Sequence, residues 1–416
     1  MRGRPVRRVA ILGAGPTGSS LATYLARRGV AVALFNRGKR PPILVGESLV
    51  PAIVPFLRKL GVEEEVSGYG RYKGGATFIF QLEEGMSFRF YEVRAARTTY
   101  SYNVPRDRFD ATLLEAARRA GARVIDHSAR VERAGGGDRL RLAEPSAALA
   151  AEALGGEPDF LVDAGGRSRR VARLLGLPTV EGSRKDAALH AHLLGVPVKI
   201  EGNVHTDRLE HGWSWRIPLR DRVSVGLVVN AEFLRKFGDS AEEQYDAFLR
   251  HDATTRGWAP GAERITPVVR YTNYQLRAER GVGENWALLG DAFGFVDPVF
   301  SSGMLIGMQS AEALAEALLQ GTRRALERYE RSVLRSLTVW QRIVDYYYDG
   351  RLLTLFRVGE YVRRTLPGRL VDFHFRKHMP RIFTGEDALN PYSLALVDFM
   401  ARYGLAGNDP RELEIR

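Results

Sequence analysis

The chain has 416 residues, of which 45% are hydrophobic and 26% charged. This balance is typical of a globular protein with two or three domains' worth of core, and it excludes a disordered or fibrous chain. No cysteine is present, which excludes disulfides, thiolate metal sites and a cysteine nucleophile, and agrees with a cytoplasmic location. We expect no membrane span, because no stretch approaches the roughly 20 apolar residues that one requires. The apolar run 9–12 is too short for an export signal.

The net charge is +12, from 61 basic and 49 acidic residues, and only seven of the basic residues are lysine. The arginines are scattered along the chain, and no nucleic-acid-binding module is evident. A generically basic surface is the simpler interpretation, and we expect no nucleic-acid partner. Attraction to an acidic partner, such as a carrier protein, is the functional alternative.

The N-terminal pattern predicts a βαβ unit, with a strand over 8–12, a glycine turn over 13–18, a helix over 19–28 and a strand over 30–35. The same α/β texture continues further along the chain. It predicts a helix over 108–120, a strand from 124, a hairpin tip or short helix within 143–157 and a strand over 160–164.

Alternating segments then predict an antiparallel sheet, with strands over 189–194, 213–218, 223–230 and 265–271, and residues 76–91 share this texture. A strand over 286–291 and a helix over 302–320 follow, and the chain is helical and aromatic-rich after residue 335. The fold class is therefore α/β: a Rossmann-like dinucleotide-binding domain over 1–335, interrupted by sheet insertions at about 66–105 and 184–280. A helical segment over 336–416 completes the chain.

The sequence Gly13-x-Gly15-x-x-Gly18 lies between the first strand and helix, where a dinucleotide-binding loop belongs. The first glycine allows the tight turn, the second lets the backbone approach a pyrophosphate, and the third lets the helix pack on the strand. The second strand ends in Asn36 instead of the usual acidic residue. An amide still binds a ribose hydroxyl but without charge assistance, so we expect binding to survive and weaken.

Two later segments favour FAD over NAD. Arg106 follows the turn at Pro105, and Gly290-Asp291 ends a buried strand, although by itself that pair is also consistent with a turn and helix cap. With the N-terminal glycines, this three-part layout resembles the FAD-dependent monooxygenases. In that family the aspartate contacts the flavin ribityl chain, which the resemblance implies for Asp291.

Four further segments narrow the resemblance. They are Gly46-Glu47-Ser48-Leu49-Val50-Pro51, Lys73-Gly74-Gly75, the W-x-W-x-I-P pattern at 213–218 and the F-x-x-P-x-x-S-x-G pattern that contains Pro298, Ser302 and Gly303. Together they resemble the flavin-dependent halogenases over nearly the whole chain. Residues 348–356 and 378–386 are similar to the phenol and pyrrole branch of that family.

The resemblance implies a reaction in which reduced FAD and O2 form a C4a-hydroperoxide that halide converts to hypohalous acid. Lys73 stands at the family's lysine position and would relay the halogen, although most lysines beside glycines are loop residues. Ser48 and Pro298 would join the glycines in binding FAD. The backbone amides of Ser302 and Gly303 would bind chloride or bromide, which is compatible with an ordinary helix cap.

The resemblance implies that Trp213 and Trp215 lie beside the flavin and keep substrate from it; by residue type alone, core aromatics on a strand are the better interpretation. Phe300 replaces a glutamate found in tryptophan halogenases, which argues for a phenol or pyrrole substrate. His190-x-His192 is interpreted as structural, and we expect no metal site.

The resemblance implies a separate flavin reductase as partner, and a small aromatic substrate that is either free or tethered to an acyl or peptidyl carrier protein. An aromatic hydroxylase, a prenyl-lipid reductase-like flavoprotein and a catalytically silent binding partner are the alternatives. The sequence leaves open the regiochemistry, the choice of halide and the oligomeric state.

Overall fold

The structure is a computed structural model that describes residues 6–38, 41–82, 84–273, 275–362 and 377–416. Its first sheet has five parallel strands in the order β19-β10-β1-β2-β7. The strands are β1 (Arg8–Leu12), β2 (Ala31–Phe35), β7 (Arg123–Ile125), β10 (Phe160–Asp163) and β19 (Trp286–Leu288). The central strands are buried on both faces, which explains why they read as continuous apolar runs.

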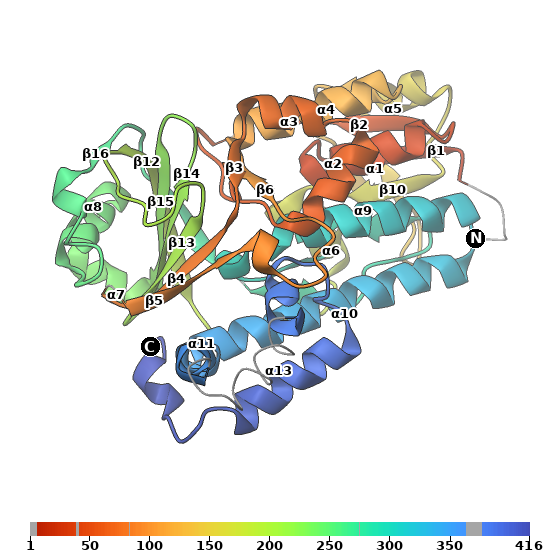
Figure 1. The fold of residues 1–416 in the computed structure, drawn as a ribbon. Helices are drawn as coiled ribbons and strands as arrows, with labels where there is room; N and C mark the ends of the chain where they lie inside the picture. The colour runs from red at the N-terminus through yellow and green to blue at the C-terminus, as the bar shows by residue number, and fades with distance from the viewer. Residues whose placement is uncertain (1–5, 39–40, 83, 274, 363–376) are drawn as a thin grey trace.

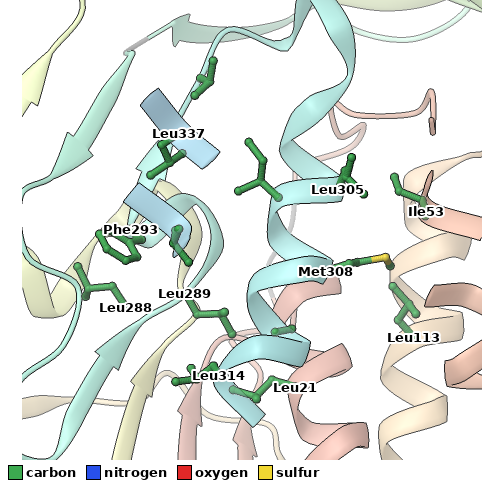
Figure 2. Packing of buried hydrophobic residues seen from close by; sticks show 14 of the residues in the cluster. Leu21, Ile53, Leu113, Leu288, Leu289, Phe293, Leu305, Met308, Leu314 and Leu337 are labelled. Atoms are coloured by element: carbon green, nitrogen blue, oxygen red, sulfur yellow. The ribbon is translucent and has the colours of Figure 1, made fainter. Parts of the chain in front are cut away.

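Three helices pack side by side against this sheet: α1 (Pro16–Ala26), α4 (Arg106–Arg119) and α9 (Ser302–Gln320). Figure 2 shows Leu305, Met308 and Leu314 of α9 in the core beside Leu21 and Leu113 of the two neighbouring helices. The helix predicted over 302–320 is confirmed at both ends. Helix α4 begins at Arg106, two residues earlier than predicted, because Pro105 stands before the first turn, a position that a residue with no N–H tolerates.

The second sheet has eight strands and lies at the far end of the molecule from β1 (Figure 1). Its strands come from two separate stretches of chain, and the parallel pairing of β13 with β4 joins them. They are β4 (Gly75–Gln81), β5 (Glu84–Arg89), β12 (Asp186–Leu194), β13 (Val204–Leu209), β14 (Gly212–Pro218), β15 (Val223–Asn230), β16 (Glu263–Arg264) and β17 (Val269–Asn273). The fold class is thus confirmed: a parallel nucleotide-binding sheet combined with an inserted mixed sheet.

The strand predicted over 265–271 is wrong in its bounds. The chain leaves β12 after β16 and pairs with it again only at β17. Pro267 lies between the two strands and has no N–H for the ladder, so pairing breaks there.

The two faces of the second sheet pack against different parts of the protein. Along β12, residues 187, 189, 191 and 193 pack in a core with helix α8 (Ala241–His251). Ser240 and Glu243 form a reciprocal capping box at the start of α8, which explains where that helix begins. Ala188 belongs instead to the main core that the sheet shares with the first domain. The opposite face therefore looks toward the nucleotide-binding half.

Several further small elements complete the two halves and the connections between them. They are α2 (Val54–Leu60), α3 (Glu63–Tyr69), the ribbon of β3 (Arg71–Lys73) with β6 (Ser101–Asn103), the hairpin of β8 (Val131–Arg133) with β9 (Leu140–Leu142), α5 (Ser146–Leu154), α6 (Arg170–Leu175), and the sheet of β11 (Thr179–Glu181), β18 (Leu276–Ala278) and β20 (Gly294–Phe295). The Ala/Gly-rich stretch 143–157 thus contains a helix, α5, one of the two forms expected for it.

The C-terminal helices run along one side of the molecule (Figure 1). They are α10 (Arg323–Tyr348), α11 (Arg351–Val362) and α13 (Pro391–Tyr403). Helix α10 packs against α9 and is continuous across the expected boundary at 335/336, so that boundary does not coincide with a helix end. Residues 363–376 of the expected helical segment lie outside the described residues.

Candidate active site

A cavity of about 510 Å³ opens at the carboxyl edge of the first sheet and extends to the second sheet. The glycine turn and the ends of β1 and β2 form one end of it, and residues of the second sheet and of the start of α9 line it as well. Its lining includes Gly13, Gly15, Asn36, Ser48, Arg106, Trp215, Asp291, Pro298 and Gly303 from the expected site. This is the edge at which doubly wound sheets bind their ligands.

The glycine turn has the shape that a dinucleotide requires. Gly13 has φ +128, and a Cβ there would lie 2.5 Å from the Ala164 carbonyl oxygen. At Gly18 a Cβ would lie 2.0 Å from the Gly13 carbonyl oxygen, so helix and turn are in close contact. A Cβ at Gly15 would meet no protein atom within 4 Å, and Gly15 lines the cavity.

Helix α1 begins directly after Gly15, and no side chain caps its first amides. Those amides and the positive end of the helix dipole are therefore available to a phosphate in the cavity. The open space beside Gly15 and the uncapped helix start fit the pyrophosphate of FAD.

Asn36, at the end of β2, is hydrogen-bonded to a second polar side chain. Its Nδ2 donates to Oδ1 of Asp126 at 3.0 Å, and Asp126 directly follows the neighbouring strand β7. Sequence reasoning missed Asp126, although a polar residue just after a strand of the parallel sheet is the same signal that picked out Asn36. The adjacent residues His127, Ser128 and Ala129 line the cavity.

Gly290 and Asp291 lie on a short turn after β19, where Gly290 has φ +61. Burial raises the pKa of Asp291, and the positive charges of Arg167 and Arg106 oppose that rise. Arg106 is anchored by Asp110, whose Oδ1 accepts from its Nε at 2.9 Å, and by the carbonyl of Val45. Arg167 was not predicted; it follows Gly165-Gly166 at the end of β10 and lines the cavity.

A buried carboxylate anchors the loop before α9. Asp297 is fully buried, and its carboxylate accepts from the Val299 N–H at 3.0 Å and from the Tyr348 hydroxyl at 2.8 Å. Ser301 adopts φ +56, and α9 begins at the next residue without a side-chain cap. Ser302 is fully buried and its Oγ has no hydrogen-bond partner among the described residues, while Ser301 and Gly303 line the cavity.

The tryptophans lie next to each other on β14, with ring centroids 5.6 Å apart. Trp215 lines the cavity, and its Nε1 donates to Ser224 at 3.2 Å. Trp213 is 2% exposed and donates from Nε1 to the Tyr348 hydroxyl at 3.0 Å, which extends the chain of hydrogen bonds to Asp297. The chain therefore links the tryptophan motif to the loop before α9.

Lys73 ends β3 and is only 2% exposed. Its Nζ donates to Ser48 Oγ at 2.8 Å and to the Leu49 carbonyl at 2.9 Å. Burial lowers the pKa of Lys73 from 10.5 to about 7. A neutral amine carries two N–H donors and one lone pair, so these two acceptors satisfy its hydrogens and leave the lone pair free.

Phe300 lies among aromatic rings. Its centroid is 5.1 Å from that of Phe383, 5.6 Å from that of Tyr347 and 6.2 Å from that of Phe78. These rings come from the second sheet, the loop before α9 and the C-terminal segment. No carboxylate stands at the position of Phe300, which keeps this part of the interior apolar.

Among the described residues, no helix is long and apolar enough to cross a bilayer. Within the same ranges, no three histidine, aspartate or glutamate side chains gather as metal ligands would. His192, in the pair interpreted as structural, binds Glu47 through Nε2 at 2.9 Å and accepts from Arg222 through Nδ1 at 3.0 Å.

The parallel sheet, the glycine turn and a cavity that extends to a second sheet define a two-sheet flavoprotein. The family described as FAD binding domain matches residues 7–353, which is most of the chain. The chain belongs to that FAD-binding family and, within it, to the flavin-dependent halogenases, which are oxidoreductases.

Two curated relatives illustrate the similarity. A tryptophan 2-halogenase of Chondromyces crocatus is 28% identical over 82% of this chain and 68% of its own length. A 1H-pyrrole-2-carbonyl-[peptidyl-carrier protein] chlorinase of Pseudomonas fluorescens is 27% identical over 83% of this chain and 84% of its own.

Solved structures agree with these matches. The myxobacterial chondrochloren halogenase is 26% identical with a TM-score of 0.72, over 96% of this chain and 98% of that one. A flavoprotein/dehydrogenase of Cytophaga hutchinsonii has a TM-score of 0.79 at 23% identity, over 95% of this chain and 98% of that one. The second likeness concerns the fold alone.

Proposed function

We propose that this FAD-dependent halogenase chlorinates or brominates an electron-rich aromatic ring of the phenol or pyrrole class, and that Lys73 carries the halogen to it. The single observation that carries this proposal is the burial of Lys73 with two neutral acceptors on its Nζ. The reduced cofactor would come from a separate flavin reductase.

The residues that would hold FAD are Gly13, Gly15 and the start of α1 for the pyrophosphate, Asn36 with Asp126 for the ribose, and Asp291 with Arg106 further along the cavity. Bound reduced FAD supplies, with O2, the two-electron oxidation that turns a halide into hypohalous acid. The amides at the start of α9, and the Ser302 hydroxyl, which has no partner in the described part of the chain, are donors suited to a chloride or bromide ion beside the flavin.

The environment of Lys73 suits nucleophilic attack on halogen. An ordinary lysine is almost wholly protonated at pH 7 and has no lone pair to offer. Here desolvation disfavours the ammonium, and no third acceptor is bonded to Nζ in the described residues. Its lone pair attacks the halogen of hypohalous acid, the N–X bond forms as the O–X bond breaks, and one N–H proton leaves with the hydroxide as water.

The aromatic rings around Phe300 support the assignment of substrate class. The rings packed on Phe300 carry no carboxylate and offer no base to help a substrate ring lose its proton, so that ring itself must be electron-rich. Phenols and pyrroles satisfy that requirement. Tethering to a carrier protein is supported by the Pseudomonas relative, whose name specifies a carrier-bound pyrrole.

The decisive experiment compares Lys73→Ala and Lys73→Arg with the wild type. FAD content, O2 consumption and halogenated product are measured with a reductase, NADH and bromide over a panel of phenols and pyrroles. Both variants should keep the first two and lose product, because a guanidinium stays protonated and is a poor nucleophile. Full halogenation by Lys73→Ala would contradict the relay.

An aromatic hydroxylase remains the enzymatic alternative, and the same reaction mixtures separate it. A hydroxylase is reduced directly by NADPH, whereas the proposed halogenase depends on the added reductase. Hydroxylated product without halide incorporation would favour the hydroxylase.

A further inference from the structure

Ser48 lies between the FAD cavity and the buried amine. It lines the cavity, is only 3% exposed, and its Oγ accepts from Lys73 Nζ at 2.8 Å. A serine hydroxyl that accepts one hydrogen bond still has its own proton to donate. Because Ser48 lines the cavity, a molecule held there is within reach of that proton.

The backbone around Ser48 is fixed on both sides. Ser48 forms a β-bridge with Asn103, and the Leu49 N–H donates to the Tyr102 carbonyl at 3.0 Å. On the preceding residue, the Glu47 carboxylate is bound by His192 of β12 at 2.9 Å. Contacts with β6 and with the second sheet therefore hold Ser48 in a defined place, as a group that moves protons must be.

We propose that Ser48 is a catalytic residue that moves the proton displaced when Lys73 takes up the halogen; this rests on the proposed function. The lone pair of Nζ attacks the halogen of hypohalous acid, forming N–X as O–X breaks. One Nζ proton passes to Ser48 Oγ while the Ser48 proton passes to the departing hydroxide, which leaves as water. The serine ends unchanged, because it accepts one proton as it gives up another.

This arrangement explains why hypohalous acid would react at Lys73 instead of escaping. Without the serine, the departing hydroxide must take its proton from a less well placed donor. General acid–base assistance of this kind contributes about 10²–10⁴-fold to a rate. We therefore expect removal of the hydroxyl to slow halogen transfer without affecting the supply of hypohalous acid.

The test uses Ser48→Ala and Ser48→Thr in the FAD-loaded enzyme, with Ser101→Ala as the matched control. Ser101 lies directly opposite Lys73 on β6 and is fully buried, but its Oγ bonds to nothing in the described residues. Four quantities are measured: FAD content, O2 consumption, halogenated product, and free hypohalous acid captured by a 1,3-diketone in bulk solution.

Ser48→Ala should keep FAD and O2 consumption, because the glycine turn, Arg106 and Asp291 still hold the cofactor. It should lose product at least about 100-fold and release more hypohalous acid to the diketone. Ser48→Thr, which retains a hydroxyl, should recover most of the product, and Ser101→Ala should match the wild type. Wild-type product from Ser48→Ala would overturn the proposal, as would an equal loss in Ser101→Ala. A parallel loss of FAD would also overturn it, because Ser48 would then serve the cofactor.

The Lys73→Ala variant separates this inference from the proposed function. If Lys73→Ala still halogenates, the relay itself is wrong and Ser48 has no relay to serve. If Lys73→Ala is inactive while Ser48→Ala has wild-type activity, the lysine relay stands and only the role of Ser48 is refuted.

Discussion

Replacing Lys73 with methionine, which is unbranched and of similar length, should change how the stability of the protein depends on pH. The folded chain holds this amine with a pKa of about 7, whereas an unfolded chain holds it near 10.4. Between these values the unfolded state binds one more proton than the folded state. Wild-type stability therefore rises with pH across this window, and the contribution of Lys73 is most unfavourable at and below pH 7.

The size of the effect follows from the two pKa values. From pH 7 to pH 9 the wild type should gain about 2 kcal/mol in its free energy of unfolding relative to Lys73→Met. The variant should be the more stable protein at pH 7, because it removes a buried amine that water would solvate better. Its advantage should shrink steadily as the pH rises.

Urea unfolding of both proteins, with equal FAD content, at pH 7, 8 and 9 measures the difference directly. The other six lysines are common to both chains and cancel. Stability profiles that stay parallel over this range would refute the reasoning, since they would mean that Lys73 titrates as an ordinary lysine.

Other predictions concern the cofactor, the pH and the partner. Gly15→Val should abolish FAD binding but leave the fold intact, because its Cβ meets only open cavity; normal flavin content in that variant would show that phosphate lies elsewhere. Asp126→Ala should weaken FAD affinity by about 10-fold in a flavin titration, as expected for loss of a charge-assisted hydrogen bond, and an unchanged affinity would remove Asp126 from the ribose site. Halogen transfer in single turnovers should rise about 10-fold from pH 6 to pH 8 as Lys73 becomes neutral; a flat profile would argue against an amine nucleophile. If the +12 charge serves an acidic carrier protein, activity on a tethered substrate should fall with salt while activity on a free phenol does not, and equal salt responses would exclude electrostatic docking.

The local sequence pattern was sufficient to predict the main elements of the nucleotide-binding half. The strand over 8–12 and the helix over 302–320 were predicted with their observed bounds, because a continuous apolar run and a long helical periodicity are properties of adjacent residues. The three glycines were recognised by spacing alone. The conformation of their turn is a property of one short segment, which the sequence specifies directly, whereas the close approach of Gly13 to Ala164 depends on the pairing of β1 with β10.

Contacts between distant segments could not be predicted from local sequence pattern. Asp126 lies 90 residues from Asn36, and the two meet only because β7 pairs with β2 in the parallel sheet. The break in the strand predicted over 265–271 was signalled by Pro267, but its place in the sheet depends on pairing with β12.

The sequence by itself determined the FAD-binding fold, the glycine loop and the candidate lysine, since each rests on residue types and short spacings. Only the tertiary structure decided that Lys73 is buried, that Ser48 and Leu49 accept its two hydrogens, and that rings from distant segments pack around Phe300. The reactivity of an amine depends on its solvation and on the groups around it, and both are set by packing between segments far apart in the chain.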